Sequence, residues 1–175
     1  MLVLRCTKQV LGLFGEKPRE VQVSGGTEGL GDWYVRLVDD GDCEGIFFLC
    51  TNAQTLYTLI LELDAAGYRS IFDLADRMLA RLLAHLHRLG ISKETLARVA
   101  EDYSQVLVGK TASRSILGSM NDLVNNLCFH TGQQMRRAGK LDLWAIEEAL
   151  NTIPQRPIGW ALAKNSLIEL CSRVR

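Results

Sequence analysis

Long apolar runs, closely spaced cysteines and an excess of charge of either sign are all missing from this sequence. Its longest apolar run, Ile46–Cys50, is far shorter than the about 18 residues that indicate a membrane-spanning helix. The 20 Lys and Arg residues balance 20 Asp and Glu residues, so net charge points to no class of partner. In Met1–Cys6 the charge at Arg5 follows an apolar run, unlike the layout of a signal peptide. We therefore expect a cytoplasmic protein with no membrane segment.

The five cysteines and three histidines show no spacing typical of a metal site or a redox motif. Cys50 and Cys128 lie in apolar stretches, where an unpaired cysteine is usually a small core residue, so we expect both to be free and buried. His85 and His87 point in different directions on one helix and cannot share a metal ion. The strings typical of zinc proteases, hydrolases and P-loops are missing too. We expect no metal and no cofactor.

The length of 175 residues and the hydrophobic share of 47% predict a packed domain of the α+β class. Apolar alternation and periodicity predict strands over 2–6, 33–38, 45–50, 55–63 and 105–108, and helices over 8–14, 70–89, 92–103, 116–137, 141–151 and 164–174. We expect a small antiparallel sheet, formed by an N-terminal meander and one later strand, packed against several helices. Residues 1–138 are predicted to form the domain, and 139–175 a helical extension packed on it.

The connections around the second strand carry the strongest turn signals. Trp33–Val38 alternates, with Trp33, Val35 and Leu37 on one face, so a half-buried strand is expected. An Asp-Gly pair within 39–42 predicts a hairpin turn, and the glycines of 23–31 predict a loop.

The segment Lys110–Asp122 (KTASRSILGSMND) differs from an ordinary solvent-facing helix start. It is rich in Ser, Gly, Asn and Asp, which together give up on the order of 3 kcal/mol of helix propensity. On a helical wheel, one stripe is apolar, and the opposite side holds a second stripe, here named the polar stripe. The polar stripe consists of Arg114, Gly118, Asn121 and Asn125. Such an unfavourable composition indicates contacts with something outside the local chain.

The start of this helix predicts an anion site. Thr111 or Ser113 can cap the helix, leaving first-turn N–H groups and a partial positive charge beside Lys110 and Arg114. Phosphate and carboxylate groups bind in such places. Five basic residues oppose Asp122 alone between 105 and 140, whereas six acidic residues oppose one arginine between 28 and 44. The residues expected to bind a ligand are Lys110, Thr111, Ser113, Arg114, Ser115, Gly118, Asn121 and Asp122, with Arg5, Lys8, Asn52 and Asn125 in support.

The residues predicted to bind a ligand are compatible with three functions. The preferred one is a non-enzymatic module that binds a phosphate-bearing ligand or a nucleic-acid backbone. The second is an interaction or regulatory protein, such as an inhibitor or antitoxin-like partner, that docks on another chain or on its own copy through the Gly118/Asn121/Asn125 face. The third is an enzyme of phosphodiester chemistry, but a single carboxylate, Asp122, does not support two-metal catalysis. A purely structural alternative pairs Arg114 with Asp122 and uses the asparagines to hold a neighbouring loop.

Four strings carry a resemblance to a known family. They are Leu2–Lys8 (LVLRCTK), Gly31–Tyr34 (GDWY), the strand end before Asn52, and Lys110–Asp122. Together they resemble an uncharacterised bacterial family of small proteins described only as a domain of unknown function. The resemblance spans roughly residues 1–125, and its most specific part is Lys110–Asp122. It implies an intracellular α+β domain and supplies no activity.

Overall fold

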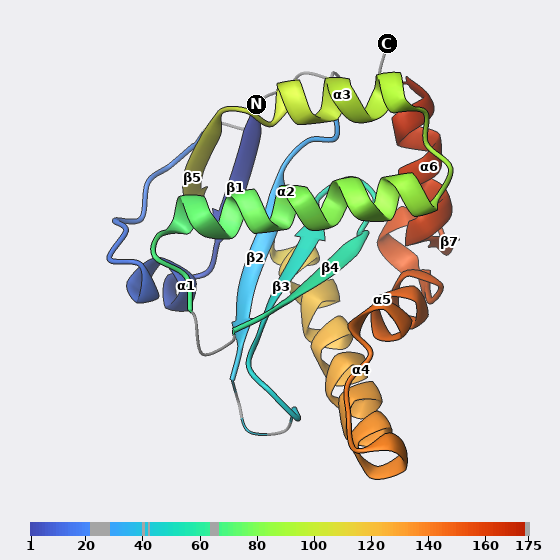
Figure 1. The fold of residues 1–175 in the computed structure, drawn as a ribbon. Coiled ribbons are helices and arrows are strands. Elements are labelled where there is room, and N and C mark those ends of the chain that lie inside the picture. The colour runs from blue at the N-terminus through green and yellow to red at the C-terminus, as the bar shows by residue number, and fades with distance from the viewer. Residues whose placement is uncertain (22–28, 40, 42, 64–66, 174–175) are drawn as a thin grey trace.

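The computed structural model describes residues 1–21, 29–39, 41, 43–63 and 67–173. Its centre is a five-stranded sheet in the order β4-β3-β2-β1-β5 (Figure 1). The strands are β1 (Leu2–Cys6), β2 (Trp33–Val38), β3 (Phe47–Asn52), β4 (Thr58–Glu62) and β5 (Val106–Lys110). The helices are α1 (Lys8–Leu13), α2 (Ile71–Arg88), α3 (Lys93–Asp102), α4 (Arg114–Ala138), α5 (Leu143–Asn151) and α6 (Ala163–Arg173). The predicted α+β class is confirmed.

The sheet is mixed, whereas an antiparallel one was expected. β2, β3 and β4 form the predicted antiparallel meander, but β1 runs parallel to both of its neighbours, β2 and β5. The difference arises from the connections, because parallel neighbours need a crossover. The chain between β1 and β2 contains α1, and the chain between β4 and β5 contains α2 and α3. Each connection returns the chain to the end of the sheet at which β1 begins, so that β2 and β5 run in the same direction as β1.

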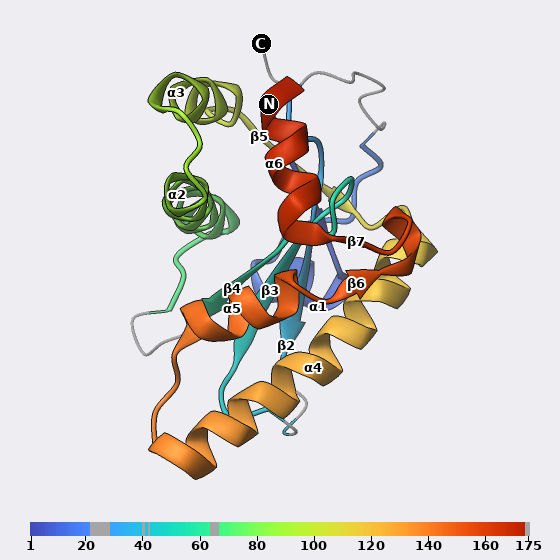
Figure 2. The ribbon, with the colours of Figure 1, turned by 90° about the vertical axis from the view of Figure 1, so that its right-hand side faces the viewer.

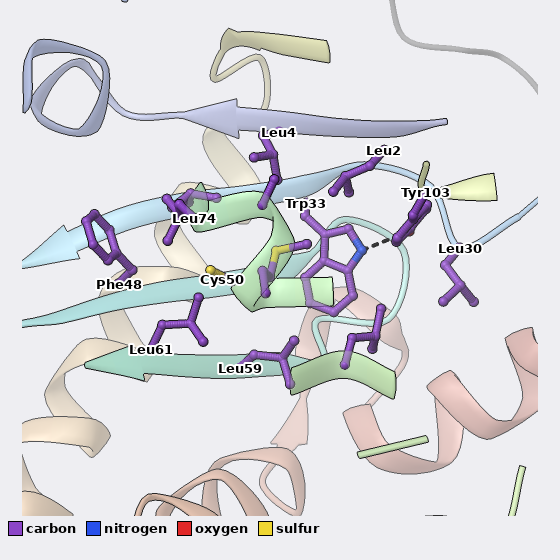
Figure 3. Close-up of a cluster of buried hydrophobic side chains, with 14 of the residues drawn as sticks. Leu2, Leu4, Leu30, Trp33, Phe48, Cys50, Leu59, Leu61, Leu74 and Tyr103 are labelled. Atoms are coloured by element: carbon purple, nitrogen blue, oxygen red, sulfur yellow. Dashed lines mark hydrogen bonds between the residues drawn. The ribbon is translucent and has the colours of Figure 1, made fainter. Parts of the chain in front are cut away.

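Helices cover both faces of the sheet and enclose two apolar cores. The first core contains side chains of α1, α2 and α6, together with Val99 of α3 and the strand residues Leu4 and Trp33. In Figure 3, Trp33 lies at the centre of this core, and its Nε1 donates a hydrogen bond of 2.9 Å to the Tyr103 hydroxyl. The second core lies on the opposite face, under α4 and α5. Figure 2 shows α2 and α3 on one side of the sheet and α4 on the other.

β2 is buried on both faces, so the prediction of a half-buried strand was wrong. Trp33 and Val35 enter the first core as expected, but Tyr34 and Val38 enter the second core. The alternation failed as a guide because α4, far away in sequence, covers the face that was expected to meet solvent. Residues 22–28, 40 and 42 lie outside the described residues. They include most of the predicted 23–31 loop and half of the predicted 39–42 turn.

Cys128 is not a free cysteine, which corrects the sequence-based expectation. It forms a disulfide with Cys43 across a Cα–Cα distance of 4.2 Å, joining α4 to the β2–β3 connection. The two residues are 85 positions apart, so their spacing carried no signal. Beside the disulfide, the backbone N–H of Glu44 donates to Thr131 Oγ1 at 3.4 Å. Cys50 is free and buried, as expected.

The C-terminal part of the chain packs against both cores. α5 contributes Ile146 and Leu150 to the second core, and α6 contributes Leu167 and Cys171 to the first. Between them lies a small antiparallel hairpin of β6 (Pro154–Gln155) and β7 (Ala161–Leu162), with a 3₁₀ turn over Arg156–Ile158, that periodicity did not predict. Among the described helices, none is long and apolar enough to cross a membrane.

Candidate functional site

A pocket of about 580 Å³ opens beside the first turn of α4. Its wall includes Val3 of β1, Asp32 and Tyr34 at the start of β2, and Ser113 and Ile116 at the start of α4. The segment 29–31, the turn between β3 and β4 and the C-terminal end of α3 also contribute to the wall. Its volume lies within the range of about 300–1,000 Å³ that is typical of sites for small molecules.

The parallel pairing of the strands explains why these segments meet. β1 and β2 run side by side, so Val3 lies close to the first residues of β2. β5 also runs parallel to β1 and ends at Lys110, opposite Cys6. Three residues, 111–113, then join β5 to α4, which lies across the second face of the sheet. These joining residues return toward the beginning of β1 and β2, because Ala112 and Ser113 line the same pocket as Val3 and Asp32.

Ser113 has the capping role predicted for Thr111 or Ser113, and it also lines the pocket. Its Oγ accepts a hydrogen bond of 3.3 Å from the backbone N–H of Ile116. The N–H groups of Arg114 and Ser115 have no acceptor within the helix, as in the first turn of any α-helix. The helix also carries partial positive charge at this end.

The remaining predicted ligand residues lie outside the pocket wall. Lys110 is exposed and pairs with Glu20 through a 2.7 Å contact between Nζ and Oε1. Lys8 is exposed at the start of α1, and Thr111 is partly buried next to Lys110. The other predicted residues are exposed on α4: Arg114, Ser115, Gly118, Asn121, Asp122 and Asn125.

The polar stripe faces outward, opposite the apolar stripe of α4, as the helical wheel predicted. Asn121 Oδ1 accepts a hydrogen bond from Arg36 Nη1 of β2. A Cβ added at Gly118 would meet no atom within 4 Å, so no described part of the chain packs closely there. In the described structure no hydrogen bond or ion pair joins Arg114 to Asp122, so the purely structural alternative lacks that pair.

Asn52 supports the pocket from behind. It is fully buried, and its Nδ2 donates to the Leu30 carbonyl at 2.7 Å. Its Oδ1 accepts from the backbone N–H groups of Gln54 and Thr55, both at 3.0 Å. Since Leu30 and Gln54 line the pocket, Asn52 holds two of its walls together.

Asp32 of the pocket wall forms an ion pair with Arg5, a buried residue that does not line the pocket. Arg5 is 1% exposed, and its Nε donates to Asp32 Oδ2 at 2.8 Å. Its Nη1 donates to the Val21 carbonyl at 2.6 Å. Its Nη2 is buried and has no hydrogen-bond partner among the residues described. The Asp32 carboxylate of the pocket wall is therefore paired with a buried guanidinium that does not itself line the pocket.

Comparison with known proteins identifies the family. A family model described as Domain of unknown function (DUF6933) matches residues 3–165. The chain belongs to the DUF6933 family. The match contains the pocket-lining segments from Val3 to Ile116 and continues through α5 and the β6–β7 hairpin, beyond the 1–125 of the resemblance. No curated protein and no solved structure matches the chain.

A second polar cluster in this DUF6933 chain was missed from the sequence. Glu147 of α5 is fully buried and accepts hydrogen bonds from Arg81 Nη2 at 2.5 Å and from the Ile60 backbone N–H at 2.7 Å. His85 Nε2 lies 2.9 Å from Glu147 Oε2, and His85 Nδ1 lies 2.8 Å from the Tyr57 hydroxyl. Burial, followed by the charge of Glu147, raises the pKa of Tyr57. Arg81 and His85, spaced i and i+4 on α2, were the available signal.

The Glu147 cluster lies away from the pocket of the DUF6933 domain, and none of its residues lines that pocket. Its bonds join α2, α5 and the edge strand β4, so we assign it a structural role. In the part of the chain that the structure describes, no group of three or more His, Cys, Asp or Glu residues is arranged to hold a metal ion. The pocket beside α4 is the candidate site.

Proposed function

We propose that this DUF6933 chain is a non-enzymatic binding module that holds a small phosphate-bearing molecule in the pocket at the start of α4. The observation that carries the proposal is the position of the pocket, which opens where Ser113 begins the helix. The free N–H groups of the first turn and the partial positive charge of the helix suit a phosphate group. Lys110 and Arg114, although outside the wall, add positive charge nearby.

The charges of the pocket wall favour a small molecule as the ligand over a nucleic-acid backbone. Its wall contains two carboxylates, Asp32 and Asp102. Among the residues that the structure describes, Asp32 has a buried cationic partner, Arg5, and Asp102 has none. A polyanion crossing the site would be repelled by Asp102. A ligand with a single phosphate can place that group at the start of α4 and its uncharged part against Val3 and Tyr34.

Blocking the pocket mouth tests the proposal. Ala112 is exposed and lines the pocket, so Ala112→Phe places a ring in the opening without replacing a core residue. Ala145→Phe is the matched control, because Ala145 is exposed on α5 outside the wall. With ribose 5-phosphate in titration calorimetry, we expect at least tenfold weaker binding for Ala112→Phe and unchanged binding for Ala145→Phe. No binding by the unmodified chain, or equal binding by both variants, would overturn the proposal.

Protein docking through the polar stripe is a second candidate, favoured by one observation. Phe129 follows Asn125 by one helical turn and is 58% exposed, so the stripe ends on an uncovered aromatic ring. Light scattering during size-exclusion chromatography tests the homodimeric form of this candidate. A dimer that Phe129→Glu converts to a monomer would support it, and a monomer at all concentrations would contradict it.

The cytoplasm is the cellular location we propose. In the cytoplasm, thiol reductants would reduce the Cys43–Cys128 disulfide to two free thiols, because disulfides persist mainly in oxidising compartments. Rapid alkylation of thiols in acid-quenched cells, followed by mass spectrometry, would show both cysteines alkylated if the protein resides in the cytoplasm. Recovery of an intact disulfide with the periplasmic or secreted fraction would place it elsewhere.

A further inference from the structure

Two helix ends of opposite partial charge contribute to the pocket wall. Asp102 and Tyr103 lie at the C-terminal end of α3, and Ala112 and Ser113 lie just before and at the cap of α4. A helix carries partial negative charge at its C-terminal end and partial positive charge at its N-terminal end. The wall therefore has a negative part, formed by the end of α3, as well as the positive part at the start of α4.

Two carboxylates belong to the negative part of the wall. Asp32 and Asp102 both line the pocket. Burial raises the pKa of Tyr103, the hydrogen bond from Trp33 lowers it, and the charges of Asp32 and Asp102 raise it further, so both carboxylates act on the same hydroxyl. That hydroxyl donates to the Gly31 carbonyl at 3.0 Å, which fixes the residue before Asp32 at the end of α3. The fold thus brings together two carboxylates that are far apart in sequence.

The negative charge of Asp102 is not balanced in the described part of the chain. Asp102 is exposed and has no ion-pair or hydrogen-bond partner among the described residues. Asp32 pairs with Arg5 through Oδ2, and its Oδ1 has no partner among these residues. Met1 also lines the pocket, but its amino group forms no ion pair with either carboxylate. Because Arg5 balances Asp32, this part of the wall carries the net charge of Asp102 and offers unpartnered carboxylate oxygens.

We infer that the ligand of this pocket carries a primary ammonium group as well as its phosphate, and that Asp32 and Asp102 bind the ammonium. An ammonium group has three N–H donors and no acceptor, so it suits carboxylate oxygens that have no partner. The inference rests on the proposed function, which places the phosphate at the start of α4. Val3 and Tyr34 then contact the chain that joins the two charged groups. The ligand class is a phosphate monoester of an amino alcohol.

A hydroxyl group is the alternative partner of these carboxylates. A hydroxyl group can donate one hydrogen bond, but it has no charge to balance that of Asp102. The experiment therefore compares aminoalkyl phosphates with hydroxyalkyl phosphates of the same length, which share the phosphate and the chain. Ethyl, butyl and hexyl chains are used, so that the result does not depend on one assumed distance between the charged groups.

Titration calorimetry of the full chain at low ionic strength, where screening of exposed charges is weak, is the test. We expect at least one aminoalkyl phosphate to bind about tenfold more tightly than its hydroxyalkyl counterpart, because a charge-assisted hydrogen bond replaces a weaker one. Equal affinities at every chain length, or tighter binding of the hydroxyalkyl phosphates, would overturn the inference and leave the proposed function standing. If none of these compounds binds, the proposed function fails, and this inference fails with it.

Asp102→Asn assigns the gain to the pocket wall. Asparagine keeps the shape of the side chain and removes its charge, and the variant should fold because Asp102 is exposed and has no partner among the described residues. We expect the advantage of the aminoalkyl phosphate to be largely lost, with no loss of affinity for the hydroxyalkyl phosphate. Glu101→Gln is the matched control, because Glu101 is an exposed neighbour on α3 that does not line the pocket. An unchanged advantage in Asp102→Asn, or an equal loss in Glu101→Gln, would overturn the inference.

Discussion

Glu147 Oε1 accepts a hydrogen bond of 2.7 Å from the backbone N–H of Ile60, so that a side chain of α5 occupies the free edge of β4. Asn151, one turn later, binds both the N–H and the carbonyl of Thr58 on the same edge, at 2.7 and 2.8 Å. An uncovered edge strand can pair with another chain. These two side chains therefore protect the sheet edge and fix α5 on it.

Replacing Glu147 should be strongly destabilising. Glu147→Ala leaves the Ile60 N–H and the Arg81 guanidinium without their buried acceptor, and the free energy of unfolding should fall by about 3 kcal/mol or more. Glu148→Ala removes only the partly exposed pair with Lys164 and should cost less than about 1 kcal/mol. Urea unfolding of both variants checks this. Equal losses for the two would show that the buried cluster has no special role.

The disulfide between Cys43 and Cys128 should stabilise the domain substantially. It closes a loop with a sequence separation of 85 residues, for which restriction of the unfolded chain is worth about 4.5 kcal/mol. We expect Cys43→Ser/Cys128→Ser to lower the urea midpoint, and a reductant to lower the midpoint of the unmodified chain to the same extent. A reductant should not affect the double variant. A midpoint that is insensitive to reductant in both proteins would contradict the pairing.

Gly118→Ala should make the isolated chain more stable. Gly118 lies within α4, and an added Cβ would meet no atom within 4 Å, so alanine gains about 1 kcal/mol of helix propensity without a clash. Ser115→Ala, at another exposed position of the same helix, is the control and should change stability by about half as much or less. Thermal unfolding measures both. A loss of stability in Gly118→Ala would mean that this face is packed in solution.

Stability should fall at alkaline pH because of buried thiols. Burial raises the pKa of Cys6 from 9.0 to about 12 and that of Cys171 to about 11. In the unfolded chain these thiols lose their protons near pH 9, whereas the folded chain keeps them protonated, so rising pH favours unfolding. The contribution is complete below pH 9 and is lost as pH rises toward 11 and 12. Urea midpoints measured at about pH 7.5, 9 and 10, which bracket the pKa of a thiol in the unfolded chain, check this. A midpoint that does not change with pH would contradict it.

Local sequence signals were enough to predict most individual elements. The helices predicted to begin at 70 and 92 are present as α2 and α3, capped by Ser70 and Ser92, and Gly139 ends α4 with a left-handed φ of 63°. These features depend on a few neighbouring residues. The direction of β1 and the burial of Tyr34 depend instead on which distant segments lie beside them, and local patterning carries no information about that.

The candidate site was predicted only in part, for the same reason. Ser113 was identified because helix capping is local, and it does line the pocket. Arg5 was named only in support, and Asp32 was not named at all. Their pairing crosses 27 residues of sequence and depends on the parallel register of β1 and β2. The polar stripe was correctly placed on α4, but it faces away from the pocket.

The position of a bound phosphate group tests the central proposal most directly. In crystals of the protein soaked with ribose 5-phosphate, we expect phosphate oxygens about 3 Å from the backbone nitrogens of Arg114 and Ser115. The sugar should extend toward Asp32. A phosphate held on the outer surface of α4 by Arg36 and Arg114, with the pocket empty at saturating ligand, would contradict the proposal.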